Sequence, residues 1–122
     1  MHMYILGPPT ITFISSYTVS LEGDNFNLSC TAINDVHANY SLQINWYKAN
    51  KLITPNRKHV LLHNETTKDS RQVKSTLLLD PVEPTDDGVY TCQAFNHPDL
   101  FSESKINLTV ECEIISYMTT VL

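Results

Sequence analysis

A cysteine, a tryptophan and a later seven-residue stretch restrict the fold of this chain more than any other feature. Cys30 is followed sixteen residues later by Trp46, and the stretch Asp86–Cys92 reads Asp-Asp-Gly-Val-Tyr-Thr-Cys. A pair of cysteines alone would say little about a fold. The joint spacing of cysteine, tryptophan and Asp-x-Gly-x-Tyr-x-Cys is far more specific, because every part of it has to be accommodated by one domain.

Short segments of alternating apolar and polar residues surround these landmarks. Such alternation turns one face of a β-strand inward and the other toward water. No long segment has the 3.6-residue period of a helix, so the pattern predicts an all-β domain. The first strand is expected to be split, over residues 10–14 and 17–21. Further inward faces are predicted for Phe26, Leu28, Cys30 and Ala32; for Leu42, Ile44 and Trp46; for Ser75, Leu77 and Leu79; and for Ile106, Leu108 and Val110.

The middle of the chain, residues 52–70, has the weakest pattern. Val60–Leu62 predicts a strand, and residues 64–70 are polar enough for a hairpin loop. Val82 lies three residues after Leu79, at a corner where an apolar side chain would fill the end of the core.

The landmarks together resemble domains of the immunoglobulin superfamily. The resemblance covers Pro9 to Glu111 and implies a β-sandwich of two antiparallel sheets. The split first strand and the intermediate separation of the cysteines look more like an I-set or C2-set domain than a variable domain. The matching spacing is Leu77-x-Leu79-x-x-Val82-x-x-x-Asp86-x-Gly88-x-Tyr90-x-Cys92.

The resemblance assigns structural roles to the landmark residues. Cys30 and Cys92 would form a disulfide that joins the two sheets, and Trp46 would pack against it. Tyr90 would be the tyrosine corner, with its hydroxyl bonded to the backbone near the preceding turn. Gly88 would supply backbone freedom at that turn.

Asp86 resembles the family aspartate that pairs with a basic residue near the start of a neighbouring strand. The residues alone do not choose its partner. The candidates are Arg57, Lys58 and Arg71. None of these structural roles implies a ligand.

Composition and motifs exclude several classes of function. The net charge of −5 and the pI of about 5.4 argue against nucleic-acid binding, which needs a basic surface. No run of about 20 apolar residues would span a membrane. No nucleophile elbow, Gly-rich phosphate loop or metalloprotease motif is present, so we expect no enzyme and no cofactor. His59 and His63 would lie about 13 Å apart on a strand, too far to share a metal ion.

The domain boundaries follow from the same pattern. Residues 1–8 are expected to be a leader or cloning residues, 9–111 the immunoglobulin-like domain, and 112–122 a linker or truncated tail. With no signal peptide, the chain resembles a fragment of a larger protein. Cys112 is the odd cysteine, and it would either bridge to a following domain or another chain, or remain a free thiol.

Four Asn-x-Ser/Thr sequons are candidates for N-glycosylation: Asn27, Asn39, Asn64 and Asn107. Asn27 and Asn107 are out of phase with inward faces, and Asn39 and Asn64 fall in predicted loops. All four are therefore expected to face solvent. Glycans on Asn27 and Asn107 would shield both broad faces and leave loop tips and edges as contact surfaces.

The last predicted loop, residues 95–101, carries more apolar side chains than a turn requires. Aromatic anchors beside polar groups are typical of protein interfaces. One interpretation is a ligand or homophilic contact centred on Leu100 and Phe101, and the other is that Phe95 or Phe101 caps the end of the core. The candidate contact residues are Phe95, His97, Leu100 and Phe101.

A basic cluster is predicted in the segment between the strand of Trp46 and the strand of Leu77. It would meet an acidic partner or a sulfated glycan, or else form a solvated edge that discourages strand-to-strand aggregation. Its members are Lys48, Lys51, Arg57, Lys58 and His59.

The sequence therefore predicts an extracellular binding module of a cell-surface receptor or adhesion protein, with another protein as partner. A cytokine- or growth-factor-receptor domain and a purely structural spacer in a tandem array are the alternatives. An intracellular sarcomeric domain is a further one, and a disulfide or occupied sequons would count against it.

Overall fold

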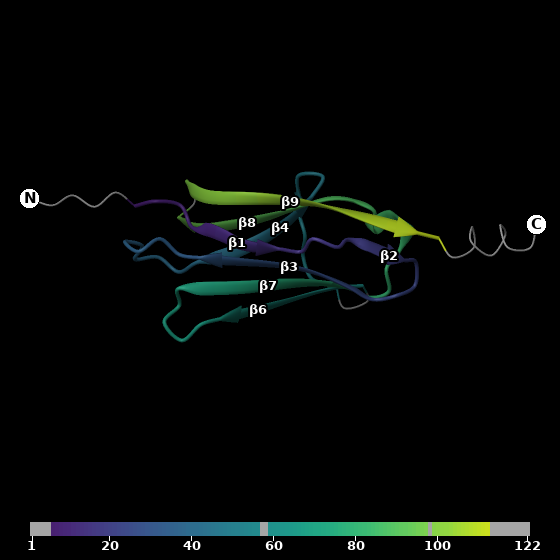
Figure 1. The fold of residues 1–122 in the computed structure, drawn as a ribbon, viewed down its shortest axis with the longest axis horizontal. Coiled ribbons are helices and arrows are strands. Elements are labelled where there is room, and N and C mark those ends of the chain that lie inside the picture. Colours follow the sequence, from purple (N-terminus) through teal and green to yellow (C-terminus); the bar gives the residue numbers. More distant parts are fainter. Residues whose placement is uncertain (1–5, 57–58, 98, 113–122) are drawn as a thin grey trace, which may run out of the picture.

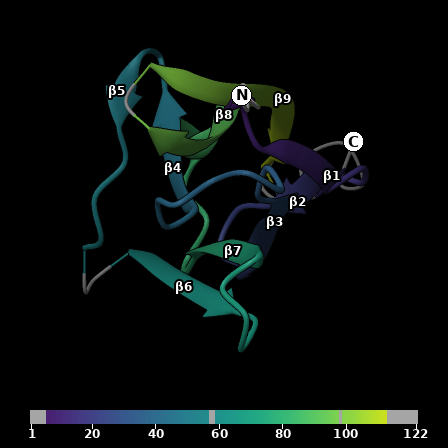
Figure 2. The same cartoon turned by 90° about the vertical axis from the view of Figure 1, so that its left-hand side faces the viewer.

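The computed structural model describes residues 6–56, 59–97 and 99–112 as two β-sheets packed face to face (Figure 1). In the end-on view, β5, β4, β8 and β9 form one layer, and β6, β7, β3 and β1 the other (Figure 2). The strands of this part of the chain are β1 (Thr10–Ile14), β2 (Val19–Leu21), β3 (Phe26–Ile33), β4 (Gln43–Lys48), β5 (Lys51–Leu52), β6 (Val60–Thr66), β7 (Gln72–Leu79), β8 (Gly88–His97) and β9 (Leu100–Glu111). A short 3-10 turn, η1 (Pro84–Asp86), connects β7 to β8.

The order of strands confirms the predicted all-β sandwich and its split first strand. The first sheet has the order β1-β3-β7-β6, and the second has the order β2-β9-β8-β4-β5. β1 runs antiparallel to β3, whereas β2 runs parallel to the end of β9. The first strand therefore serves both sheets in turn.

The core is built from the predicted inward faces. Trp46 of β4 is almost fully buried, and its indole nitrogen donates a hydrogen bond to Ser75 Oγ of β7 at 2.9 Å. A buried indole N–H needs such an acceptor, so this bond also links the two sheets. Cys30 of β3 and Cys92 of β8 form a disulfide across the same interior, with a Cα–Cα distance of 6.5 Å. Val82 is buried and closes the end of the core.

Two predicted loops are shorter than the sequence suggested. β6 continues to Thr66, because its residues pair with β7 as far as Val73. Asn64 is therefore on a strand, and the expected hairpin loop at 64–70 was wrong for its first residues. Thr67 and Asp69 tighten the remaining turn, since Asp69 accepts hydrogen bonds from the Thr67 hydroxyl and from the backbone N–H of Arg71.

The second correction concerns the candidate contact residues. Phe95 and His97 belong to β8, and Leu100 and Phe101 belong to β9. Phe95 pairs with Phe101, and His97 with Leu100, across a bulge. The predicted loop at 95–101 was therefore wrong, because cross-strand pairing continues almost to the turn.

Tyr90 and Asp86 lie where the second sheet meets η1. The Tyr90 hydroxyl donates a 2.6 Å hydrogen bond to the Asp86 carbonyl, which is the arrangement of a tyrosine corner. Gly88 has a φ of 139°, a backbone conformation that residues with a Cβ rarely adopt.

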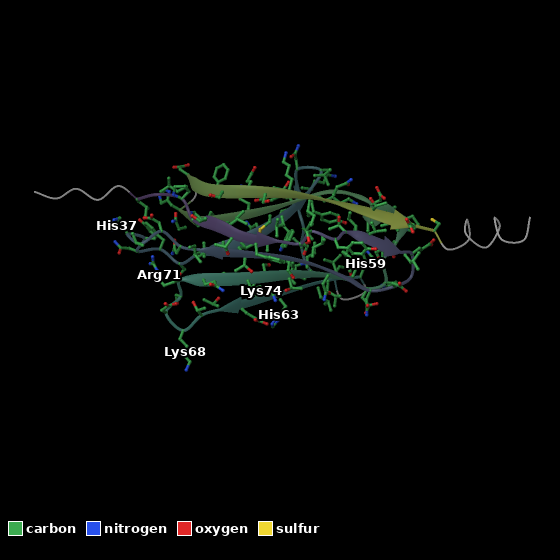
Figure 3. The ribbon with its side chains drawn as sticks, in the orientation of Figure 1. His37, His59, His63, Lys68, Arg71 and Lys74 are labelled. Carbon is green, nitrogen blue, oxygen red and sulfur yellow. A yellow bond between two sulfur atoms is a disulfide. The ribbon has the colours of Figure 1, made fainter. Side chains whose placement is uncertain are left out.

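The side chain of Asp86 is held by His59, which was not among the predicted partners. His59 precedes β6, and its Nε2 lies 2.8 Å from Asp86 Oδ1. Arg71 lies nearer the opposite end of the sandwich (Figure 3), where its guanidinium donates to the carbonyls of Asn34 and Asp35. Arg57 and Lys58 are outside the described residues.

Candidate protein-contact surface

The end of the sandwich that carries the β3–β4 loop and the β8–β9 turn exposes a row of apolar and aromatic side chains. The exposed fractions are 77% for Val36, 57% for Tyr40 and 47% for Phe101. We call the set the apical patch. Its members are Val36, Tyr40, His97, Leu100 and Phe101.

Contacts connect the members of this patch into one surface. Val36 and Tyr40 line the same hollow of about 490 Å³. The rings of Tyr40 and His97 meet edge to face, with centroids 5.5 Å apart and an angle of 64° between planes. His97 is the cross-strand partner of Leu100. The β3–β4 loop and the β8–β9 turn therefore offer a continuous surface.

Buried asparagines hold the β3–β4 loop in place. Asn96 donates from its amide nitrogen to Asn34 Oδ1 and to the Gly7 carbonyl, each at 3.0 Å. Asn34 in turn donates to the carbonyl of Tyr40 at 3.0 Å. Asn96 continues the inward face formed by Cys92 and Ala94, and it is 2% exposed. These bonds fix the loop backbone at Tyr40, so less ordering of the loop is needed when a partner binds.

Phe95 and Phe101 lie on the outer face of the second sheet. Ala94 and Cys92 are buried, so Phe95 alternates with them and faces outward, opposite Gln43 on one side and Phe101 on the other. These positions argue against the interpretation that either phenylalanine caps the core. They extend the apical patch onto the broad face.

That broad face becomes polar away from the patch. Gln93 donates to Glu103 Oε1 at 3.1 Å and accepts a longer bond of 3.4 Å from the Tyr47 hydroxyl. The three side chains border a shallow hollow of about 270 Å³ together with Asn50, Thr91 and Lys105. The result is a polar face beside an apolar corner, which resembles the rim and centre of a protein interface.

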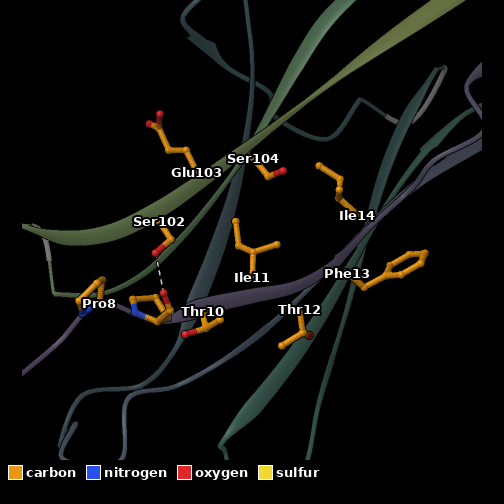
Figure 4. A pocket seen from close by; sticks show the side chains of 10 residues that line it. Pro8, Thr10, Ile11, Thr12, Phe13, Ile14, Ser102, Glu103 and Ser104 are labelled. Atoms are coloured by element: carbon orange, nitrogen blue, oxygen red, sulfur yellow. Dashed lines mark hydrogen bonds between the residues drawn. The ribbon is translucent and has the colours of Figure 1, made fainter.

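A third hollow, of about 460 Å³, lies at the edge of the sandwich between β1 and β9 (Figure 4). The Ser102 hydroxyl donates to the Pro9 carbonyl across it, and Ile11 and Ile14 supply its apolar wall. β1 and β9 belong to different sheets there, so the hollow is the open seam of the sandwich.

The four sequons all lie at exposed positions. Asn27 is on the outer face of the first sheet, and Asn107 is on the outer face of the second. Asn39 lies in the β3–β4 loop and lines the hollow beside Tyr40. Asn64 is on the edge strand β6.

The predicted basic cluster is partly engaged in internal contacts. The Lys48 ammonium donates to the Thr85 carbonyl and lies 5.4 Å from the centroid of the Tyr90 ring. His59 is held by Asp86. Among the described members only Lys51 is in the exposed class, so the interpretation as a structural and solvated edge is favoured over a ligand site.

The free thiol of Cys112 lies just after β9 and is partly exposed. A hydrogen bond with the Glu22 side chain, with the charge of that carboxylate, raises the pKa of the thiol above its usual value. A higher pKa means less thiolate near neutral pH and slower disulfide exchange.

Residues 6–56, 59–97 and 99–112 contain neither a cluster of metal-binding side chains nor a long apolar helix. No group of three or more His, Cys, Asp or Glu side chains among them is arranged to hold a metal ion. Within the same residues, no helix has the length and apolar character needed to cross a membrane.

Sequence reasoning missed Val36, Tyr40 and the role of His59. An apolar residue and a tyrosine in an otherwise polar loop were a signal for the first two. Nothing local distinguished His59 from its basic neighbours.

The sequence is similar to an immunoglobulin domain family and to two cell adhesion molecules. A family model described as an immunoglobulin domain matches residues 8–96. Cell adhesion molecule DSCAM from Homo sapiens is 28% identical over 113 residues, which are 91% of this chain and 5% of that protein. DSCAML1 from Gallus gallus is 29% identical over 107 residues, which are 88% of this chain and 5% of that protein. The chain thus spans a small part of the length of these relatives.

Solved structures show the same fold. The N-terminal Ig1-2 module of the Drosophila receptor protein tyrosine phosphatase DLAR has a TM-score of 0.69 at 22% identity, over 86% of this chain and 50% of that chain. The BTLA ectodomain has a TM-score of 0.60 at 16% identity, over 84% of this chain and 99% of that chain.

Proposed function

This chain belongs to the immunoglobulin domain family, and we propose that it is an extracellular recognition module of a cell-surface receptor or adhesion protein. Its similarity to cell adhesion molecules supports this function. The Cys30–Cys92 disulfide supports the compartment, because disulfides persist in oxidising environments. The proposed module spans residues 9–111, and residues 112–122 are a linker or a truncated tail.

The apical patch is the observation that carries the proposal. Tyr40 and Phe101 expose large rings at the end of the domain, and the loop beneath Tyr40 is fixed by buried amide bonds. Rigid aromatic side chains bind with a small loss of conformational entropy, which makes them effective interface anchors. The proposed contact set is the apical patch together with Phe95.

The exposed sequons favour the end of the domain over its broad faces. Glycans on Asn27 and Asn107 would cover part of each sheet. A glycan on Asn39 would stand directly beside Tyr40. The partner is another protein, in cis or in trans, and the module performs no chemistry. A ligand-binding domain of a cytokine receptor would use the same patch, whereas a spacer would not need one.

The test uses fluorescent beads coated with the domain secreted from mammalian cells. Aggregation of the beads and their binding to a panel of adherent cell lines are measured together. We expect the double variant Tyr40→Ala/Phe101→Ala to lose binding at least tenfold, the scale of removing hot-spot side chains. Phe13→Ala is the matched control, because this exposed ring lies on the first sheet.

Three outcomes distinguish a contact at the apical patch from a contact elsewhere on the domain and from a spacer. Loss of binding by the double variant, with Phe13→Ala unchanged, supports the patch. Equal binding by the double variant and the wild type means that the contact lies elsewhere. Wild-type beads that neither aggregate nor bind any cell line favour the spacer.

A further inference from the structure

His59 pairs with the carboxylate of Asp86, a contact that an arginine or lysine would make with a permanent positive charge. The residue lies immediately before β6, and its ring crosses to η1, which precedes β8. Its side chain is 17% exposed and that of Asp86 is 11% exposed. Backbone bonds fix its position, because His59 N–H donates to the Asn56 carbonyl and Asp80 N–H donates to the His59 carbonyl, each at 2.9 Å.

Both ring nitrogens face carboxylates. Nε2 lies 2.8 Å from Asp86 Oδ1, and Nδ1 lies 3.9 Å from Glu83 Oε1. The other oxygen of Asp86 already accepts the backbone N–H of Glu83 at 2.7 Å. A carboxylate oxygen only accepts, so Nε2 carries a hydrogen in this bond.

The second nitrogen distinguishes the two protonation states. Nδ1 is buried and makes no hydrogen bond of ordinary length and angle within the described structure. In the neutral ring its lone pair points toward the negative charge of Glu83, which is unfavourable. When a proton from solvent binds Nδ1, the resulting N–H and the positive charge face that carboxylate instead.

We propose that His59 is a pH-dependent latch between the start of β6 and η1, strengthened when the imidazole gains a proton and weakened when it loses one. The latch acts at the same turn that the Tyr90 hydroxyl and the Lys48 ammonium hold by the carbonyls of Asp86 and Thr85. Acidification would therefore tighten the end of the domain opposite the apical patch.

The charges around the ring favour its protonated form. The hydrogen bond with Asp86 raises the pKa of His59, the charges of Asp86 and Glu83 and the Pro81 carbonyl act in the same direction, and burial opposes them. Lys48 is the described cation at the same turn, and its ammonium is directed to the Thr85 carbonyl. The pKa of His59 in the folded state lies above the ordinary 6.5. The contribution of its positive charge to folding stability is therefore complete below pH 6.5, and it is lost as the pH rises through the folded-state pKa.

The experiment measures the folding equilibrium constant by urea denaturation at fixed ionic strength from pH 6 to pH 8. Three chains are compared: wild type, His59→Gln and His59→Arg. The ratio of the wild-type constant to that of His59→Gln should rise roughly threefold to fivefold from pH 8 to pH 6, the scale of a partly exposed ion pair. The folding equilibrium constant of His59→Arg should not change with pH over the same range, because the charge of arginine is permanent.

His63→Gln is the matched control for losing an imidazole. His63 lies four residues further along β6 and pairs with the exposed Glu65 at 3.3 Å. This variant should keep the wild-type pH slope. A constant ratio of wild type to His59→Gln, or the wild-type slope in His59→Arg, overturns the proposal.

If His59→Gln does not fold, the wild type alone decides the question. The ring protons of His59 are then followed by NMR through the same pH range. A titration midpoint above 6.5 supports the latch, and a midpoint at or below 6.5 overturns it.

Discussion

Replacing Tyr90 by phenylalanine tests the anchor that joins β8 to η1. The Tyr90 side chain is 2% exposed, and its hydroxyl gives the Asp86 carbonyl a 2.6 Å hydrogen bond. Phenylalanine keeps the ring, its packing and its contact with the Lys48 ammonium. The substitution therefore removes one hydrogen bond and no more volume than that of the hydroxyl oxygen.

The expected cost follows from the carbonyl that is left behind. Asp86 is buried, so its carbonyl would face carbon instead of water after Tyr90→Phe. A buried polar group without a partner costs about 1–3 kcal/mol. For a domain of this size, a loss of about 2 kcal/mol lowers the melting temperature by roughly 8–9 °C.

The assay is thermal and urea unfolding of the oxidised domain at pH 7. Tyr47→Phe is the matched control, because the Tyr47 hydroxyl is only part-buried and makes a longer 3.4 Å bond to Gln93. That control should stay within about 0.5 kcal/mol of wild type. A Tyr90→Phe variant that loses no more stability than Tyr47→Phe would refute the reasoning about the tyrosine corner.

Other perturbations give equally definite expectations. Alanine at both Cys30 and Cys92, which are 62 residues apart, should lower the free energy of unfolding by about 4 kcal/mol in urea, since the unfolded chain regains the entropy of the closed loop. Asn96→Ala should cost about 1–3 kcal/mol and speed amide hydrogen exchange at Asn34, and unchanged exchange there would contradict the anchoring role. Burial raises the pKa of the Tyr90 phenol in the folded state. The contribution of the neutral phenol to folding stability is therefore complete below pH 10 and is lost at higher pH. The stability gap between wild type and Tyr90→Phe should therefore narrow above pH 10, and a constant gap would contradict this.

The buried core could be predicted from the sequence because each core position depends on local alternation and one long-range landmark. Leu28, Leu77 and Leu108 all lie fully inside, as their alternation indicates. A period of two determines which face is buried once a strand is recognised. Trp46 and the two cysteines then fix which faces meet.

The ends of strands could not be predicted in the same way. A polar residue such as Asn64 looks like part of a loop, yet its backbone pairs with Ser75. Pairing at a strand end depends on the register and turn geometry of the neighbouring strand, which composition does not record. The same limitation explains why Phe95 and Phe101 were expected in a loop and lie in paired strands.

The partner of Asp86 was missed for a chemical reason. The resemblance to a known family suggested an arginine or lysine, and the sequence offers several close to the right place. A histidine fills the position only when its shorter side chain starts within reach of the carboxylate, and the backbone bonds at Asn56 and Asp80 determine that placement. Such a substitution keeps the contact while making its charge depend on pH.

The position of each sequon along its strand determines what a glycan there can block. Asn107 and Phe101 are six residues apart on β9, which separates them by roughly 20 Å. A glycan on Asn107 would therefore shield the middle and far half of the second sheet and leave the apical patch open. Asn39 borders the same hollow as Val36 and Tyr40. Occupancy of Asn39, more than that of Asn107, should thus decide whether this end of the domain is free to bind.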